Sequence, residues 1–294
     1  MSAGVFARVT AVVAVGVLAI GVGVLSVLAL QSTASSESPE SAGPAPTFDF
    51  GDRATTSPSA SATPSPTSTS TTSTPERFLA VDGSDLWRAT SGACGGAAPE
   101  VEYSTDGGES WAEVTPAAAV QVMSLATFGE GQAEAVAATD AACTPAALRT
   151  YTAGRAWESY PQMLAGATFV SPTDRSTVVV AGAAMTAPCA DARSARTSRT
   201  ATGIVCDGTA FLWADGEWMS LAAGAVALDA VAGTIVVAHV SDACRSGVTV
   251  TQFTGTSGDE LGCVSDVDAA SPAAISVLGD DLVFWSGDNV FGLD

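Results

Sequence analysis

The chain contains no lysine. All eleven basic residues are arginine, and 31 acidic residues outnumber them, which gives a formal net charge of −20. A surface of that sign repels the phosphate backbone of DNA and RNA, so we expect no nucleic-acid partner. Histidine is nearly absent as well: His239 is the only one, it does not lie near a pair of cysteines, and no Cys-x-x-Cys motif occurs. We therefore predict neither a metal site nor a bound cofactor.

Helical periodicity is missing from residues 77–294, whereas apolar and polar residues alternate there in short runs. In residues 100–103, for example, Val101 and Tyr103 alternate with two glutamates. Only 14% of all residues are charged and 47% are hydrophobic, so the chain can fill a packed core. Alternating runs of this kind, separated by turns that contain Gly and Asp, predict an all-β domain over residues 77–294.

Charged residues are also missing from residues 10–30, an apolar run long enough to cross a bilayer as a helix. Arg8 precedes the run and Glu37 follows it, which favours a cytoplasmic N-terminus of residues 1–9. A cleaved signal peptide, cut near Ala34, is the competing interpretation. Because the run is longer than a usual signal h-region, we favour an uncleaved transmembrane anchor. The predicted location is therefore the plasma membrane, crossed once through this helix, with the C-terminal domain extracellular.

Residues 31–76 are rich in Ser, Thr, Pro and Ala and show no apolar periodicity. Such a segment buries too little surface to offset the entropy of ordering it, so we predict a disordered linker. Its prolines make it semi-extended. Ser and Thr beside Pro suit O-glycosylation, and an unmodified spacer is the alternative.

The octet Ser-Thr-Asp-Gly-Gly-Glu-Ser-Trp at 104–111 follows one of the alternating runs. Asp and Gly are turn residues, and the Trp opens the returning strand with a large apolar side chain. The octet resembles the Asp-box of BNR and sialidase-like propeller proteins, in which the motif is structural and lies on hairpin turns away from the active face. On this resemblance we assign a structural Asp-box to five positions: Ser104, Asp106, Gly108, Ser110 and Trp111.

Partial copies of the octet recur along the chain. Trp157 and Trp218 each end such a copy, and Trp157 follows Trp111 by 46 residues. A period near 45 residues with short strands is typical of propeller blades. We predict a β-propeller of about five four-stranded blades, at residues 77–118, 119–164, 165–222, 223–267 and 268–294. The last unit is short by a strand, which a strand from the N-terminal side would complete. A non-closing array and a six-bladed ring with irregular blades are the alternatives.

Six cysteines in an exported domain indicate disulfides. Their positions in the repeats suggest how they pair. One pair flanks a long hairpin loop, a second lies at one edge of a blade, and the third occupies equivalent positions of neighbouring blades. We predict the pairs Cys189–Cys206, Cys244–Cys263 and Cys94–Cys143.

The loop between Cys189 and Cys206 holds three arginines, Arg193, Arg196 and Arg199. We predict that this loop contacts an anionic partner such as a cell-wall polymer or a lipid headgroup. A solvated insertion tip is the alternative interpretation.

The resemblance to sialidases raises the question of catalysis. Those enzymes use an arginine triad from different blades and a tyrosine nucleophile with a glutamate partner. Here the only tyrosines are Tyr103, Tyr151 and Tyr160, and all three lie in or beside strands that lead to or from the turns. We therefore predict no catalytic residues and no enzymatic activity. The predicted function is a cell-surface, membrane-anchored binding or scaffold module for an extracellular protein or envelope component; the alternative is a glycan-active hydrolase of the sialidase-like group.

Overall fold

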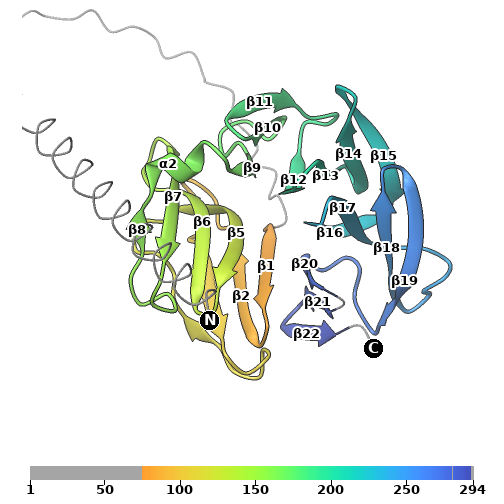
Figure 1. The fold of residues 1–294 in the computed structure, drawn as a ribbon, viewed down its shortest axis with the longest axis horizontal. Helices are drawn as coiled ribbons and strands as arrows, with labels where there is room; N and C mark the ends of the chain where they lie inside the picture. The colour runs from red at the N-terminus through yellow and green to blue at the C-terminus, as the bar shows by residue number, and fades with distance from the viewer. Residues whose placement is uncertain (1–74, 280, 293–294) are drawn as a thin grey trace, which may run out of the picture. The chain divides into compact units, whose positions relative to one another are not determined.

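A computed structural model describes residues 75–279 and 281–292 of the 294-residue chain. The strands in this part form six antiparallel sheets around one axis, a six-bladed β-propeller (Figure 1). The prediction of an all-β propeller is confirmed. The prediction of five blades is wrong, and the alternative of a six-bladed ring with irregular blades is the one observed.

Four blades have four strands each, in the order in which they follow along the chain. Blade 1 holds β1 (Arg77–Asp82), β2 (Asp85–Thr90), β3 (Glu100–Ser104) and β4 (Ala112–Glu113). Blade 2 holds β5 (Gln121–Gly129), β6 (Gln132–Ala138), β7 (Pro145–Thr150) and β8 (Glu158–Ser159). Blade 4 holds β12 (Ala192–Ser198), β13 (Ala201–Cys206), β14 (Thr209–Ala214) and β15 (Glu217–Ala223). Blade 5 holds β16 (Ala225–Val231), β17 (Thr234–His239), β18 (Gly247–Thr254) and β19 (Ser257–Ser265).

Blades 3 and 6 have three strands each. Blade 3 holds β9 (Thr168–Val170), β10 (Thr177–Val180) and β11 (Ala183–Thr186), and the helix α2 (Pro161–Leu164) precedes it. Blade 6 holds β20 (Ala273–Leu278), β21 (Asp281–Ser286) and β22 (Asn289–Gly292). Within the described residues no strand from the N-terminal side completes blade 6, so the predicted closure by a shared blade is not observed.

The predicted third unit, residues 165–222, contains two blades. Its first half is irregular, because β9 runs antiparallel to β12. Thr168 at the start of β9 contacts Thr197 near the end of β12, and the carbonyl of Arg175, beyond the other end of β9, accepts the N–H of Ala192. These strands have three or four residues and no copy of the octet marks them. The repeat pattern therefore skips blade 3.

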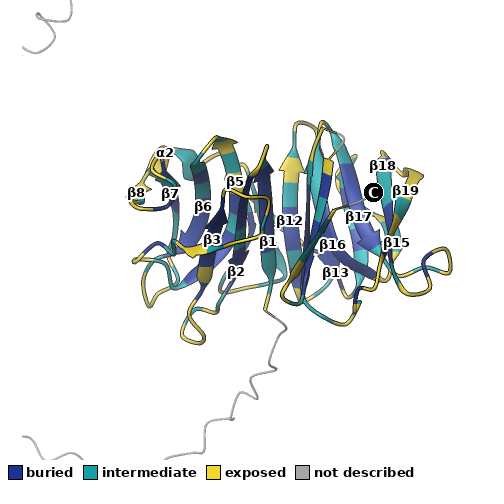
Figure 2. Ribbon diagram, turned by 90° about the horizontal axis from the view of Figure 1, so that it is seen from below, coloured by how far each residue is buried: buried dark blue, intermediate teal, exposed yellow. Residues whose placement is uncertain are grey.

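The core consists of six apolar clusters, one between each pair of neighbouring blades. The innermost strands and their hairpin partners supply most of the buried side chains (Figure 2). Trp87, for example, is fully buried between blades 1 and 2, with its ring centroid 4.3 Å from that of Tyr103. The ring closes where β1 packs beside β20, around Leu79, Ala274 and Trp285.

The three predicted disulfides are present. Cys94–Cys143 joins the loops between the second and third strands of blades 1 and 2, and its Cα atoms are 5.9 Å apart. Cys189–Cys206 pins the chain before β12 to the end of β13, and Cys244–Cys263 lies within blade 5. The pairing follows from the blade positions even though the third unit was divided wrongly, because both ends of each pair lie at the same end of their strands.

The predicted cytoplasmic segment 1–9, membrane helix 10–30 and nearly all of the linker 31–76 lie outside the described residues. Across residues 75–279 and 281–292, no helix is long and apolar enough to cross a membrane.

Candidate functional site

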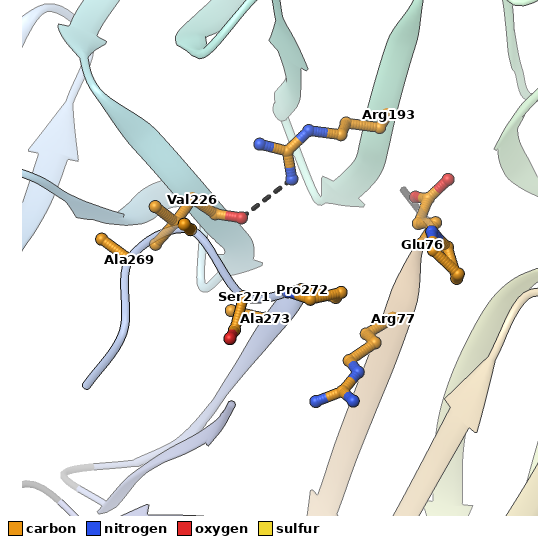
Figure 3. Close-up of a pocket in the computed structure, with 10 residues that line it drawn as sticks. Glu76, Arg77, Arg193, Val226, Ala269, Ser271, Pro272 and Ala273 are labelled. Atoms are coloured by element: carbon orange, nitrogen blue, oxygen red, sulfur yellow. Dashed lines mark hydrogen bonds between the residues drawn. The ribbon is translucent and has the colours of Figure 1, made fainter. Parts of the chain in front are cut away.

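A pocket of about 140 Å³ lies where the innermost strands β1, β12, β16 and β20 begin (Figure 3). These four strands surround the axis of the ring (Figure 1). Its walls come from both ends of the domain. Three neighbouring residues, Pro75, Glu76 and Arg77, form one side. The opposite sides are formed by Arg193 on β12, Val226 on β16 and the chain from Ala269 to Ala273, which leads into β20. Blades 1, 4, 5 and 6 therefore meet here.

Arg193 supplies a cation to this pocket. Its two terminal nitrogens donate to the carbonyl oxygens of Val226 at 2.9 Å and Ala225 at 3.1 Å, which fixes the guanidinium across the gap between blades 4 and 5 (Figure 3). Among the described side chains, no carboxylate oxygen lies within 4.0 Å of it. Burial lowers the pKa of Arg193, and the charges of Glu76 and Asp191 act in the opposite direction. The pocket thus contains a largely buried cation without a paired anion.

Glu76 holds the start of β1 against blade 4. Its carboxylate accepts the N–H of Ser194 at 2.6 Å, and Arg175 lies 3.7 Å from its second oxygen. Ser194 can present its N–H in this direction because a bulge interrupts the pairing of β12 with β13, and Ser194 has a positive φ of 55° there. Arg175 also pairs with Asp191 and donates to the carbonyl of Ala192 at 2.7 Å. Glu76 is therefore already paired. Arg77, the other arginine that lines the pocket, also has no carboxylate within 4.0 Å among the described side chains, but it donates to the carbonyl of Gly287 on blade 6. Arg193 is thus the unpaired cation on the blade 4 side of the pocket.

A second pair of charges lies further along the same strands. Arg196 donates to the carbonyl of Ala195 at 2.9 Å, and its guanidinium carbon lies 4.9 Å from the ring centroid of Phe78 on β1. Asp229 on β16 accepts the N–H groups of Val277 and Ala230. Burial lowers the pKa of Arg196 and raises the pKa of Asp229. The charge of Arg196 stabilises the ionised form of Asp229, and the reverse also holds. The two side chains nevertheless form no ion pair within 4.0 Å.

The three predicted anion-binding arginines do not form one site. Arg193 and Arg196 lie on β12, the innermost strand of blade 4, and Arg199 lies in the exposed turn after it. At about 3.3 Å per residue, the length of β12 separates Arg199 from Arg193 by roughly 20 Å. The prediction of a loop is wrong because the segment forms the first hairpin of a blade. Arg193 alone of the three lines the pocket.

Residues 104–111 form a hydrogen-bonded turn between β3 and β4. One Asp106 oxygen accepts from the hydroxyl of Ser104 at 2.7 Å and from the N–H of Ser110 at 2.9 Å, and the hydroxyl of Ser110 donates to the other. Bonds from Ser110, and then from Ser104, lower the pKa of Asp106 to about 2. The indole N–H of Trp111 donates to the carbonyl of Gly108 at 3.0 Å.

The partial copy of the octet at 150–157 forms the same kind of hydrogen-bonded turn, with threonine hydroxyls as the only side-chain acceptors. Thr150 accepts the N–H of Gly154 at 3.0 Å, as Ser104 accepts that of Gly108 at 2.9 Å. Thr152 accepts the N–H of Ala156 at 3.0 Å, in the place of Asp106. The N–H of Gly107 bonds to the carbonyl of Ser84 in the β1–β2 turn, so the octet lies at the end of blade 1 opposite to the pocket.

The sequence did not point to Glu76, Arg77, Arg175 or Asp229. None of them belongs to a recognisable motif, and the pocket forms only when residues 75–77 meet β12 and the chain before β20. The only available signal was the concentration of arginine at 193–199. The three tyrosines lie elsewhere: Tyr103 is buried between blades 1 and 2, and Tyr151 and Tyr160 lie on blade 2.

No protein-family model and no curated protein matches this chain. Solved structures with a similar arrangement include YCF48 bound to D1 peptide, with a TM-score of 0.40 and 14% identity over 72% of this chain and 74% of that one. A mutant of AofleA from Arthrobotrys oligospora has a TM-score of 0.43 and 10% identity over 74% and 86% of the two chains. A GH43_1 enzyme from Xanthomonas citri has a TM-score of 0.34 and 11% identity over 72% and 80%. At these values the similarity concerns the fold alone, and the octet keeps its likeness to the Asp-box only as a resemblance.

The prediction that the protein has no enzymatic activity is contradicted by this comparison. The similar structures include GH43 enzymes, a sialidase and a β-xylosidase, which are glycoside hydrolases. That prediction was based on the positions of the three tyrosines. These positions argue only against the tyrosine nucleophile that sialidases use. The propeller fold is shared by binding modules and by glycoside hydrolases, so it does not exclude catalysis.

Proposed function

We propose that the protein is a membrane-anchored, cell-surface binding module whose central pocket holds an anionic group of an envelope component. The observation that carries this proposal is Arg193, a largely buried guanidinium that faces a cavity and has no carboxylate within 4.0 Å among the described side chains. Leaving a buried charge unpaired costs free energy, which a bound carboxylate or phosphate would recover.

The size of the pocket and the charge of the protein restrict the kinds of ligand that the pocket can hold. A volume of about 140 Å³ accommodates one small group and not a chain of residues. The net charge of −20 repels a long polyanion, and this repulsion reaches only about 10 Å at 0.1 M salt. We therefore expect recognition of a single phosphate or carboxylate group on a cell-wall polymer.

Export is supported by the three disulfides, since such bonds persist in oxidising surroundings. The uncharged run at 10–30 supports the anchor, and the Ser/Thr/Pro-rich segment after it supports display at a distance from the membrane. Fractionation of cells tests this part. We expect the intact chain in the membrane fraction and its propeller accessible to protease added outside; a soluble, protected chain contradicts it.

Binding is tested by calorimetry on the purified 294-residue chain, with glycerol phosphate and glutarate as probes. We expect Arg193→Gln, in protein that still folds, to weaken binding of the preferred probe at least tenfold. Arg199→Gln is the matched control, because it removes the same charge from an exposed turn. Ala270→Glu, which places a carboxylate at the exposed rim of the pocket, provides a second test with Arg193 intact. Equal affinities for all four proteins, or no binding of either probe, would overturn the proposal.

A further inference from the structure

An exposed group of aromatic side chains lies on blade 2, outside the central pocket. Phe128 lies at the end of β5, Tyr151 directly after β7 and Tyr160 directly after β8. Phe128 is 39% exposed and Tyr151 52% exposed. Their ring centroids are 5.3 Å apart at a T-shaped angle of 71°, and those of Tyr151 and Tyr160 are 6.1 Å apart. The three rings therefore form one surface rather than isolated residues.

Arg149 on β7 lies at the centre of this surface, and we call the four residues the aromatic platform. Its guanidinium carbon is 4.6 Å from the ring centroid of Phe128 and 5.8 Å from that of Tyr160. Its Nε donates to Glu134 on β6 at 2.5 Å, and this bond is the main reason why the pKa of Arg149 is raised. The platform thus combines ring surfaces with a neutralised ion pair that keeps free donor and acceptor positions.

The platform is exposed because blade 3 is incomplete. Alternate residues of β6 point to opposite sides: Ala133 and Ala135 pack against blade 1, and Val136 and Ala138 pack against blade 3. Glu134, and Arg149 bonded to it, therefore face the blade 3 side. Blade 3 covers only the inner part of that side, with its three short strands. None of the four platform residues belongs to any of the six core clusters.

The geometry points to a binding site for an uncharged saccharide on the aromatic platform. Sugar rings present C–H groups that stack on aromatic faces, and their hydroxyls both donate to a carboxylate and accept from a guanidinium. The Arg149–Glu134 pair offers both partners with no net charge, and Glu158, which lies 3.5 Å from the hydroxyl of Tyr160, adds a further acceptor. This set suits a neutral ligand with many hydroxyls better than an anion. A protein interface needs about 800 Å² on each partner, more than three rings and one ion pair supply. The site is separate from the central pocket and does not depend on the function proposed for it.

The test is calorimetric titration of the 294-residue chain with chitotetraose, cellotetraose and mannotetraose. We expect at least one tetrasaccharide to bind, and Tyr151→Ala to weaken its binding at least tenfold without a change in melting temperature. Tyr151 is mostly exposed, so the variant is expected to fold. Leu261→Ala is the matched control, because Leu261 is a 44% exposed apolar residue on blade 5. Arg193→Gln, in the central pocket, should bind the saccharide as the unchanged chain does.

Two results would overturn the inference. One is the absence of binding of all three tetrasaccharides to the folded chain. The other is binding that Tyr151→Ala and Phe128→Ala leave unchanged, which would place the sugar elsewhere. If no saccharide binds but Tyr151→Ala removes association with a protein of the same envelope, the platform is a protein interface and the saccharide assignment is wrong.

Discussion

Asp85 links the first two blades through two hydrogen bonds. It is buried, and one of its oxygens accepts the hydroxyl of Tyr103 at 2.6 Å and the N–H of Gly131 at 2.8 Å. Tyr103 belongs to blade 1 and Gly131 to the β5–β6 turn of blade 2. Burial, and then the bond to Asp85, raise the pKa of Tyr103 well above its usual value of about 10.

This raised pKa predicts a loss of stability at high pH. A group whose pKa is higher in the folded state contributes stability below its unfolded pKa, here about 10, and loses it as the pH rises further. We expect the free energy of unfolding to fall above pH 10 by at most about 1.4 kcal/mol per pH unit from this residue. Urea titrations at pH 8 to 11 measure it. Tyr103→Phe should flatten the decline and Tyr151→Phe should not; equal slopes in both variants contradict the assignment.

At the scale of single residues, the sequence predicted contacts that lie close along the chain or repeat with the blades. The Asp106 turn is local, and the cysteine pairs follow from equivalent positions in the repeats. Glu76 was missed because its role depends on Ser194, 118 residues away, and on the bulge that orients it. No local pattern contains that information.

At the scale of strands, predictability followed the alternation of buried and exposed side chains. β3 was recognised as a strand because its buried residues Val101 and Tyr103 alternate with glutamates. β13 buries all six of its residues and fell inside the predicted loop between Cys189 and Cys206. β12 was predicted to be a loop because its sequence is Ala-Arg-Ser-Ala-Arg-Thr-Ser, which alternates poorly. Arg193 is accommodated there because it borders the pocket, and Arg196 because it lies over the ring of Phe78 and is favoured by the charge of Asp229. The arginines that interrupt the alternation of β12 therefore have two effects. They caused the strand to be missed, and they pointed to the pocket that Arg193 lines.

The disulfide between neighbouring blades should contribute more than those within a blade. Cys94 and Cys143 are separated by 49 residues, against 17 and 19 for the other pairs. In the chain-entropy model, replacing both by Ser costs about 4 kcal/mol of unfolding free energy, and replacing Cys244 and Cys263 costs about 3 kcal/mol. Guanidinium titrations of the two double variants under non-reducing conditions measure the difference. A smaller loss for Cys94 and Cys143 would show that blades 1 and 2 are held by their apolar cluster alone.

At the scale of the whole ring, the six interblade clusters differ in size. The cluster between blades 1 and 6 has three fully buried apolar residues, the fewest of the six. Arg77 strengthens this interface: it donates to the carbonyl of Gly287 at 2.6 Å, and its guanidinium carbon lies 4.1 Å from the ring centroid of Trp285. The sequence predicted a ring but not this closure, which joins the two ends of the domain by side chains instead of by a shared sheet.

Loss of Arg77 should open the ring at one interface. We expect Arg77→Ala to lower the free energy of unfolding by about 1–3 kcal/mol, because a partly buried hydrogen bond and a cation–π contact are removed together. Amide hydrogen exchange should accelerate in β1 and β20 and remain unchanged in blades 3 and 4. Arg155→Ala, which removes an arginine from an exposed turn of blade 2, is the control. Uniform acceleration over all blades would contradict a local role.

The position of Pro75 has a mechanical consequence. The upstream chain joins the propeller at the axis, beside the pocket, and not at the rim. Tension along that chain is therefore applied at Glu76 and Arg77, which are bound to blade 4 through Ser194 and to blade 6 through Gly287. Blades 4 and 6 therefore share this force before it acts on the hydrogen bonds between β1 and β2. If the chain is anchored as proposed, a pull that shifts Glu76 would also displace one wall of the pocket, and tension on the predicted linker would then change the occupancy of the pocket.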